Sequence, residues 1–110
     1  MAIKLIADSG STKTEWCLMN GKSVKTFYTQ GLSPYFLSAE QIEYVINEEL
    51  RGKFKKTEPD EIYFYGTGCS NADNVKLVKK AVQKVFNDAK IFVDHDLMGA
   101  AKALCGHDKG

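Results

Sequence analysis

The 110-residue sequence has no long apolar run and almost no net charge. No apolar stretch approaches the roughly 20 residues that a membrane-spanning helix needs. The first residues run into an apolar segment without the layout of a secretory signal. The net charge of +1 gives no electrostatic reason to expect binding to nucleic acid or to an anionic membrane. These absences predict a cytoplasmic protein that binds neither nucleic acid nor a membrane.

Cysteine is also scarce. Cys17, Cys69 and Cys105 are odd in number and widely spaced, and no two of them form a CxxC pair. A disulfide framework needs paired cysteines, and zinc or iron–sulfur sites usually need closely spaced ones. The pattern therefore favours reduced thiols, which fits the cytoplasm.

The composition is that of an ordinary globular domain. Hydrophobic residues make up 44% and charged residues 26% of the chain, and the length is enough for one domain with a real core. The sequence contains no internal repeat, low-complexity stretch or interdomain linker. We therefore treat residues 1–110 as one domain.

Short apolar runs predict five strands, and Asn20-Gly21 is a strong hairpin signal between the second and third. The expected strands cover residues 3–7, 14–19, 23–29, 61–65 and 90–93. Helical spacing predicts three helices in the order β-β-β-α-β-α-β-α. This order indicates an α/β domain with a mixed five-stranded sheet and flanking helices.

The three helices are predicted from their caps and apolar stripes. Ser38 and Gln41 form a capping box before a stripe that should fade at Gly52 and give way to a charged connector. Ser70 or Asn71 caps the second helix. The stripe of the second helix is Val75, Val78, Val82, Val85 and Phe86; that of the third is Leu97, Ala100, Ala101 and Leu104.

The polar turn between the first two strands is the most informative segment. Gly10 lets the backbone approach a phosphate closely, while Ser11, Thr12 and Lys13 offer donors to its oxygens. Asp8 ends an apolar strand at the edge where α/β sheets usually bind ligands, and its carboxylate suits Mg²⁺ directly or through water. The turn therefore predicts a site for a phosphate and a metal ion.

Three other interpretations of this turn can be compared. A Walker-type loop needs a glycine before the lysine and a helix after it, but Thr12 precedes Lys13 and a strand follows. The spaced glycines of a dinucleotide fingerprint are absent. A plain polar hairpin turn remains open on the residues alone, because Gly, Ser and Thr are common in such turns.

A second polar loop follows the fourth strand. Gly66, Thr67 and Gly68 precede a predicted helix, so their amides could face an anion or a sugar hydroxyl. A simple strand-to-helix turn explains them equally well. Asp94, His95, Asp96 and His107 lack the spacing of a known metal motif, and a capped helix start is the better interpretation of that segment.

Several segments together resemble a known family. They are residues 8–16, 31–34, 65–68, 94–96 and 99–101. The first is similar to the first phosphate motif of the sugar kinase, heat-shock chaperone and actin superfamily. With Glu15 and Trp16, it resembles more narrowly the N-acetylglucosamine kinase and BadF/BadG/BcrA/BcrD-type ATPase family. The segments occur in the family's order along nearly the whole chain.

The resemblance implies a ribonuclease-H-like topology and the N-terminal lobe of an ATP-dependent sugar kinase. Such a kinase would use ATP and Mg²⁺ to phosphorylate N-acetylglucosamine or a related hexose. The expected second lobe, the C-terminal lobe of the same protein, is missing, so we expect the isolated lobe to be inactive. A homodimer is compatible with this picture.

The resemblance also implies residue roles. Asp96 would be the catalytic base that accepts the proton of the attacking sugar hydroxyl, with Asp94 as the rival for this role. An N-cap aspartate is the other interpretation of Asp96. Ser33, Gly66, Thr67, Gly68 and Asp96 would bind the sugar. Relatives usually carry an asparagine in the loop of Ser33, so the identity of the sugar stays open.

Two alternatives accompany the kinase prediction. One is a BadF-type ATPase that couples hydrolysis to conformational change or electron transfer, although the scattered cysteines argue against a cluster-binding activator. The other is a relative that keeps the fold without catalysis.

Overall fold

The structure is a computed structural model of the chain. It describes residues 3–10, 12–54, 58–66, 69 and 71–94. Four predicted site residues, and the helix expected after them, lie outside the described residues. These site residues are Ser11, Thr67, Gly68 and Asp96.

Five strands form one mixed sheet, which confirms the predicted α/β class. The strands are β1 Lys4–Ser9, β2 Lys13–Asn20, β3 Ser23–Gln30, β4 Glu61–Gly66 and β5 Lys90–Asp94. Their order across the sheet is β3-β2-β1-β4-β5. Strands β1, β4 and β5 are parallel, whereas β2 pairs antiparallel with both β1 and β3. The hairpin between β2 and β3 turns at Gly21, whose φ of 63° is one that glycine adopts without strain.

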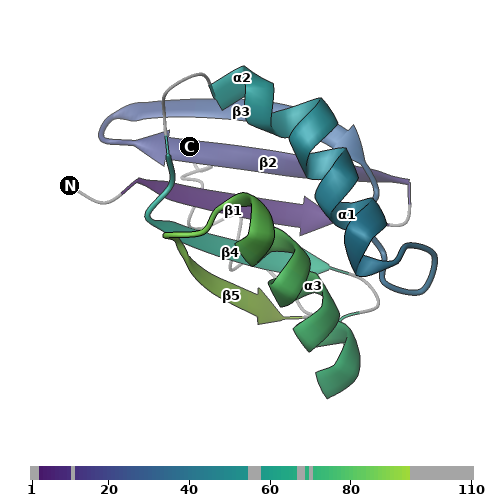
Figure 1. Cartoon of the computed structure of the whole chain (residues 1–110). Coiled ribbons are helices and arrows are strands. Elements are labelled where there is room, and N and C mark those ends of the chain that lie inside the picture. Colours follow the sequence, from purple (N-terminus) through teal and green to yellow (C-terminus); the bar gives the residue numbers. More distant parts are fainter. Residues whose placement is uncertain (1–2, 11, 55–57, 67–68, 70, 95–110) are drawn as a thin grey trace.

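All described helices lie over one face of the sheet (Figure 1). Helix α1 (Ala39–Val45) continues through a π-helical segment, η1 (Ile46–Arg51), into the short α2 (Gly52–Phe54). Helix α3 (Ala72–Val85) crosses from β4 to β5 and packs beside α1. No helix in this described part of the chain is long and apolar enough to cross a membrane.

The starts predicted for the first two helices are correct, but one predicted end is wrong. Ser38 makes both hydrogen bonds of the capping box with Gln41. Asn71, rather than Ser70, is the N-cap of α3, and its side chain accepts a bond from the Asn74 N–H. The first helix does not fade at Gly52.

The helix continues past Gly52 because Phe54 has a buried place to occupy. Gly52 has ordinary helical dihedrals, with φ at −64°. The ring of Phe54 lies between those of Phe27 and Phe86, with ring centroids 5.4 and 5.9 Å away. Burial of this aromatic ring outweighs the modest cost of one glycine in a helix.

The core lies between the sheet and the helices. On this face, which we call the helix face, Trp16 and Phe64 meet edge to face with their centroids 6.1 Å apart. Leu5 and Ala7 of β1 belong to the same cluster. On the opposite face, which we call the far face, Ile6 forms a smaller buried cluster with its neighbours. These neighbours are Cys17, Met19, Tyr63 and Tyr65.

Candidate functional site

The corner between β1 and β2 lies at the carboxyl end of the parallel strands. Asp8 is the penultimate residue of β1 and is half-buried on the far face, because it has the same strand parity as Ile6. The N–H of Gly10 donates to the carbonyl of Lys13 at 2.9 Å, which closes a tight turn. The structure therefore places Asp8 and Gly10 at the same corner of the sheet.

A row of polar side chains crosses the whole sheet on the far face. Strand register places Tyr28, Glu15, Asp8, Tyr65 and Asp94 next to one another, one residue from each strand. Three of these five residues are carboxylates. The row lies where the parallel strands end, which is the usual ligand-binding edge of an α/β sheet.

The two other described residues of the turn are accessible. Thr12 and Lys13 are exposed, and Lys13 is the first residue of β2 rather than part of the loop. Its ammonium group lies over the ring of Tyr28, 5.5 Å from the centroid. Because it has the parity of Glu15, Lys13 projects from the same face as Asp8.

Sequence reasoning missed that two hydroxyls of the corner face inward. Ser9 and Thr14 are buried, and their side-chain oxygens lie 2.8 Å apart. Ser9 Oγ also accepts a hydrogen bond from the N–H of Leu32, and Thr14 Oγ1 donates to the carbonyl of Gln30. These hydroxyls hold the loop after β3 against the corner and do not face a ligand.

Ser33, predicted to bind a sugar, is buried inside a turn. Its hydroxyl accepts a bond from the N–H of Tyr35 at 3.3 Å. Its carbonyl accepts bonds from the N–H groups of Phe36 and Leu37, both at 3.0 Å. A turn-forming role therefore accounts for serine at this position.

Gly66, predicted to bind the sugar with its neighbours, ends β4 under a tight packing constraint. A Cβ added there would lie 2.8 Å from Cε1 of Phe64, closer than real Cβ contacts occur. The Gly66 carbonyl accepts a bond from the N–H of Cys69 at 3.3 Å. Packing and turn formation explain this glycine without a ligand.

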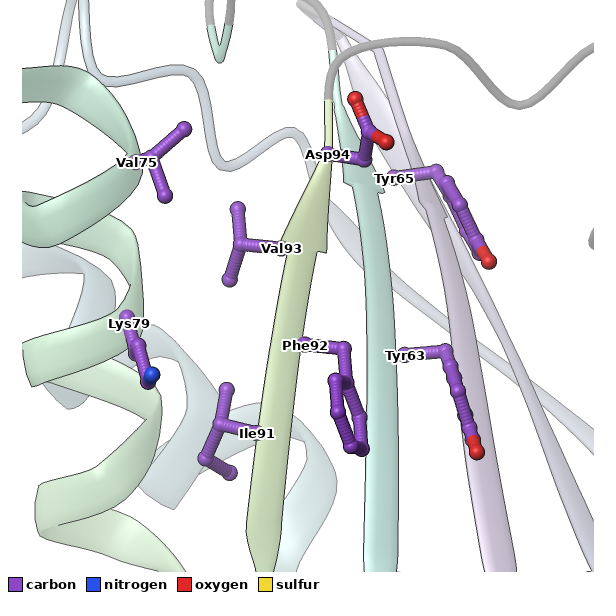
Figure 2. Close-up of a pocket in the computed structure, with 8 residues that line it drawn as sticks. All are labelled: Tyr63, Tyr65, Val75, Lys79, Ile91, Phe92, Val93 and Asp94. Carbon is purple, nitrogen blue, oxygen red and sulfur yellow. The ribbon is translucent and has the colours of Figure 1, made fainter. Parts of the chain in front are cut away.

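A hollow of about 470 Å³ lies beside β5 (Figure 2). Its far-face side is lined by Tyr63, Tyr65, Phe92 and Asp94, and its helix-face side by Val75, Lys79, Ile91 and Val93. The rings of Tyr63 and Phe92 stack with their centroids 5.0 Å apart. The hollow thus follows both faces of β5.

Two tyrosines in this hollow have perturbed acidity. The Tyr63 hydroxyl donates to Glu61 at 2.9 Å, and this bond, followed by partial burial, raises the pKa of Tyr63. Burial, followed by the negative charge of Asp94, raises the pKa of Tyr65. Both phenols therefore stay protonated at neutral pH and act there as neutral hydrogen-bonding groups.

The described residues offer neither a preformed metal cage nor an activated thiol. No group of three or more His, Cys, Asp or Glu side chains among them is arranged to hold a metal ion. Cys17 and Cys69 are both buried. Burial and the charge of Asp94 raise the pKa of the Cys69 thiol to about 11. A metal ion at Asp8 would take its remaining ligands from water or from a bound phosphate.

The fold is ribonuclease-H-like, with helices packed on a mixed five-stranded sheet. One solved structure that shares it is an uncharacterized protein from Pseudomonas aeruginosa with similarity to the peptidase YeaZ. It matches with a TM-score of 0.56 and 18% identity, over 98% of this chain and 50% of that one. YeaZ from Pseudomonas aeruginosa matches with a TM-score of 0.50 and 18% identity, over 94% and 47%.

These likenesses concern the fold, since the identity is low. The chain spans about half the length of both solved proteins. No protein-family model matches the sequence, and no curated protein matches it either.

The comparisons correct the family prediction. The structural neighbours are YeaZ-like proteins, not N-acetylglucosamine kinases or BadF-type ATPases, so that resemblance and the kinase function based on it are wrong. The physical reason lies in the motifs themselves. Ser9 and Thr14 form the inside of the β1–β2 corner, Ser33 forms a turn, and Gly66 avoids Phe64. Such residues follow the fold rather than one activity.

Proposed function

We propose that this chain is a lobe of an actin-like ATPase fold that binds the phosphates of a Mg²⁺–nucleotide at the β1–β2 corner. The observation that carries the proposal is the position of Asp8. Its carboxylate lies at the carboxyl end of β1 on the far face, in one row with Glu15 and Tyr65. Ligands of open α/β sheets gather at this edge.

The chemistry of the corner fits such a ligand. Asp8 is a hard oxygen donor of the kind that Mg²⁺ binds, usually with water and phosphate completing the shell. Thr12 and Lys13 are exposed beside it and can donate to phosphate oxygens. Bound Mg²⁺ would neutralise part of the phosphate charge. Asp8 would orient the ion, and Lys13 would bind the outer oxygens.

Lys13 can leave its present contact at small cost. An exposed cation–π contact such as that with Tyr28 is worth about 0.5–1 kcal/mol. A hydrogen bond between charged groups contributes about 1.5–3 kcal/mol. Transfer of the ammonium group from the ring to a phosphate is therefore favourable.

The buried hydroxyls beneath the corner keep it rigid. Ser9 and Thr14 tie the turn to the loop at Leu32, so the backbone around Gly10 is held before a ligand arrives. Preorganisation of this kind lowers the entropy lost on binding. Because the solved neighbours are twice as long, we further propose that a second lobe contacts the rest of the nucleotide.

The test is equilibrium binding of ATP to the full-length protein, with Mg²⁺ and with EDTA. We expect Asp8→Asn to weaken binding at least about tenfold with Mg²⁺ and much less with EDTA. Lys13→Ala should weaken binding under both conditions. The matched control is Asp88→Asn, an exposed aspartate just before β5 begins, at the opposite end of the sheet.

The outcomes separate clearly. A wild-type protein that binds no ATP, or an Asp8→Asn variant that binds it with wild-type affinity, would contradict the proposal. Thermal unfolding of each variant shows whether the fold is intact.

A peptidase function, suggested by the name of one neighbour, has less support. A cysteine peptidase would need an activated cysteine beside a base. Cys69 is buried with a pKa raised to about 11, and Cys17 is buried as well. Neither of these two described cysteines is therefore an activated thiol.

A further inference from the structure

Strand β5 is an edge strand among the described residues, since it pairs only with β4. The N–H of Lys90 donates to the carbonyl of Asp60, at the start of β4. Backbone groups alternate in direction along a strand. Lys90, Phe92 and Asp94 therefore turn their amides toward β4, whereas Ile91 and Val93 turn theirs outward. An open edge of this kind is a template for pairing with another strand.

The side chains of β5 form a pattern that is complementary to the same strand running in the opposite direction. Figure 2 shows Phe92 and Asp94 on the far face of β5, and Ile91 and Val93 on its helix face. Lys90 has the strand parity of Phe92 and therefore shares the far face. Read backwards, the strand has the opposite charge at each end and the same aromatic residue at its centre. Such a strand is complementary to itself in an antiparallel arrangement.

We infer that two copies of this chain pair antiparallel through β5 about a two-fold axis at Phe92. This register places Lys90 opposite Asp94 of the second copy, and Asp94 opposite its Lys90. It also places Ile91 opposite Val93, the two residues whose amides point outward, so four backbone hydrogen bonds can form. The two sheets then become one continuous sheet.

The charges and rings support this occupant over an unrelated strand. Lys90 and Asp94 are both exposed, and opposite charges directly across an antiparallel pair are stabilising. Phe92 is 49% exposed and already stacks on Tyr63. In this register Phe92 and Phe92 of the second copy form a non-hydrogen-bonded pair, in which opposite side chains come closest. Their two rings then extend the stack of Phe92 on Tyr63. Interfaces with two-fold symmetry require this kind of self-complementarity.

The inference is independent of the nucleotide proposal, because it requires no ligand at the β1–β2 corner. It is tested on the full-length protein by sedimentation equilibrium, at loading concentrations from about 5 to 500 µM. A short edge interface predicts a weak, concentration-dependent dimer in this range. A protein that stays monomeric throughout would overturn the inference.

A charge exchange tests the register. Lys90→Asp places two like-charged pairs across the interface and should weaken dimerisation about tenfold. Asp94→Lys should do the same. The double variant restores both pairs with their signs exchanged and should recover most of the affinity. Lys22→Asp, in the exposed β2–β3 turn, is the matched control and should have no effect.

A proline tests the backbone bonds. Val93→Pro removes an outward N–H and leaves the bonds to β4 intact, because proline is tolerated at the open side of an edge strand. We expect it to abolish the dimer with little change in thermal stability. A dimer that persists in both Val93→Pro and Lys90→Asp, or single charge variants that the double does not rescue, would overturn the inference. If Val93→Pro fails to fold, the charge exchange decides alone.

Discussion

The side-chain oxygens of Ser9 and Thr14 lie 2.8 Å apart beneath the β1–β2 corner. One arrangement of donors and acceptors gives each of these polar groups a hydrogen-bond partner. The N–H of Leu32 donates to Ser9, Ser9 to Thr14, and Thr14 to the carbonyl of Gln30. Hydrogen bonds in such a chain polarise and strengthen one another in a buried setting. The corner is therefore held by a continuous polar chain.

We predict that Ser9→Ala lowers the free energy of unfolding by about 1–3 kcal/mol, because it leaves the buried N–H of Leu32 without its acceptor. Urea denaturation measures the change. Thr12→Ala, three residues further along the same turn and exposed, is the control and should stay within about 0.5 kcal/mol of the wild type. A Ser9→Ala protein as stable as the wild type would show that these hydrogen bonds contribute nothing to stability.

The two hydroxyls should also be coupled. The cost of Ser9→Ala combined with Thr14→Val should differ from the sum of the single costs by about 0.5 kcal/mol or more, since residues in one network are not additive. Additive costs would mean that the two side chains act separately.

The glycines at positions 66 and 52 give a matched pair of substitutions. Gly66→Ala should destabilise the protein by about 1–3 kcal/mol, because the new Cβ meets the Phe64 ring at 2.8 Å. Gly52→Ala meets nothing within 4 Å and has helical dihedrals, so it should stabilise by about 0.5–1 kcal/mol. Thermal unfolding checks both signs. Equal effects of the two changes would contradict this interpretation of Gly66.

The helix start at Ser38 should contribute measurably to stability. Ser38→Ala removes the acceptor of the Gln41 N–H and one half of the capping box, which should cost about 1 kcal/mol. Ser23→Ala is the control, since Ser23 is an exposed strand residue with no cap to lose. Chemical denaturation of the two variants gives the comparison. We expect both to show the same dependence of the unfolding free energy on denaturant concentration. A loss that is equal in both would argue against a capping role.

Local patterns predicted the elements well because their causes are local. The hairpin at Asn20 and Gly21 and the cap at Ser38 depend on residues a few positions apart, and both are as predicted. The end of the first helix was not predictable in this way. It extends to Phe54 because that ring packs on Phe27 and Phe86, which are distant in the sequence.

The site was harder to predict than the fold. Asp8 and Ser9 are neighbours on one strand and must face opposite sides of the sheet, but the sequence did not show which side carries the helices. Both parities of β1 are apolar, with Leu5 and Ala7 on one face and Ile6 on the other, so hydrophobic pattern could not decide. Ser9 shares the parity of Leu5 and Ala7, and that is the only indication the sequence offers of its structural role.

The resemblance failed for a related reason. A turn rich in Gly, Ser and Thr is what a tight corner over a polar chain requires, whatever the protein does. The motif therefore identified the fold correctly and the activity wrongly. Fold-level likeness does not establish function.

Cys69 should make the protein sensitive to alkaline pH. Burial, and then the charge of Asp94, raise its pKa from 9.0 to about 11 in the folded state. The folded pKa of Cys69 lies above the unfolded one. The contribution of the protonated thiol to the free energy of unfolding is therefore fully present below pH 9. It is lost as pH rises toward 11. We expect the free energy of unfolding to fall over this window, and to fall less in Cys69→Ala. A wild type and a Cys69→Ala variant with the same pH dependence would contradict the assignment.

The same shift predicts low reactivity of the thiol. At pH 8 only about one Cys69 in a thousand would be thiolate, given a pKa of about 11, and the side chain is buried as well. Iodoacetamide should therefore label Cys69 far more slowly in the folded protein than in urea, as measured by mass spectrometry of the digested protein. Because the thiolate is the reacting species, the labelling rate should also rise with pH through the window in which stability declines. Labelling at equal rates in the folded and unfolded protein would show that Cys69 is neither buried nor shifted.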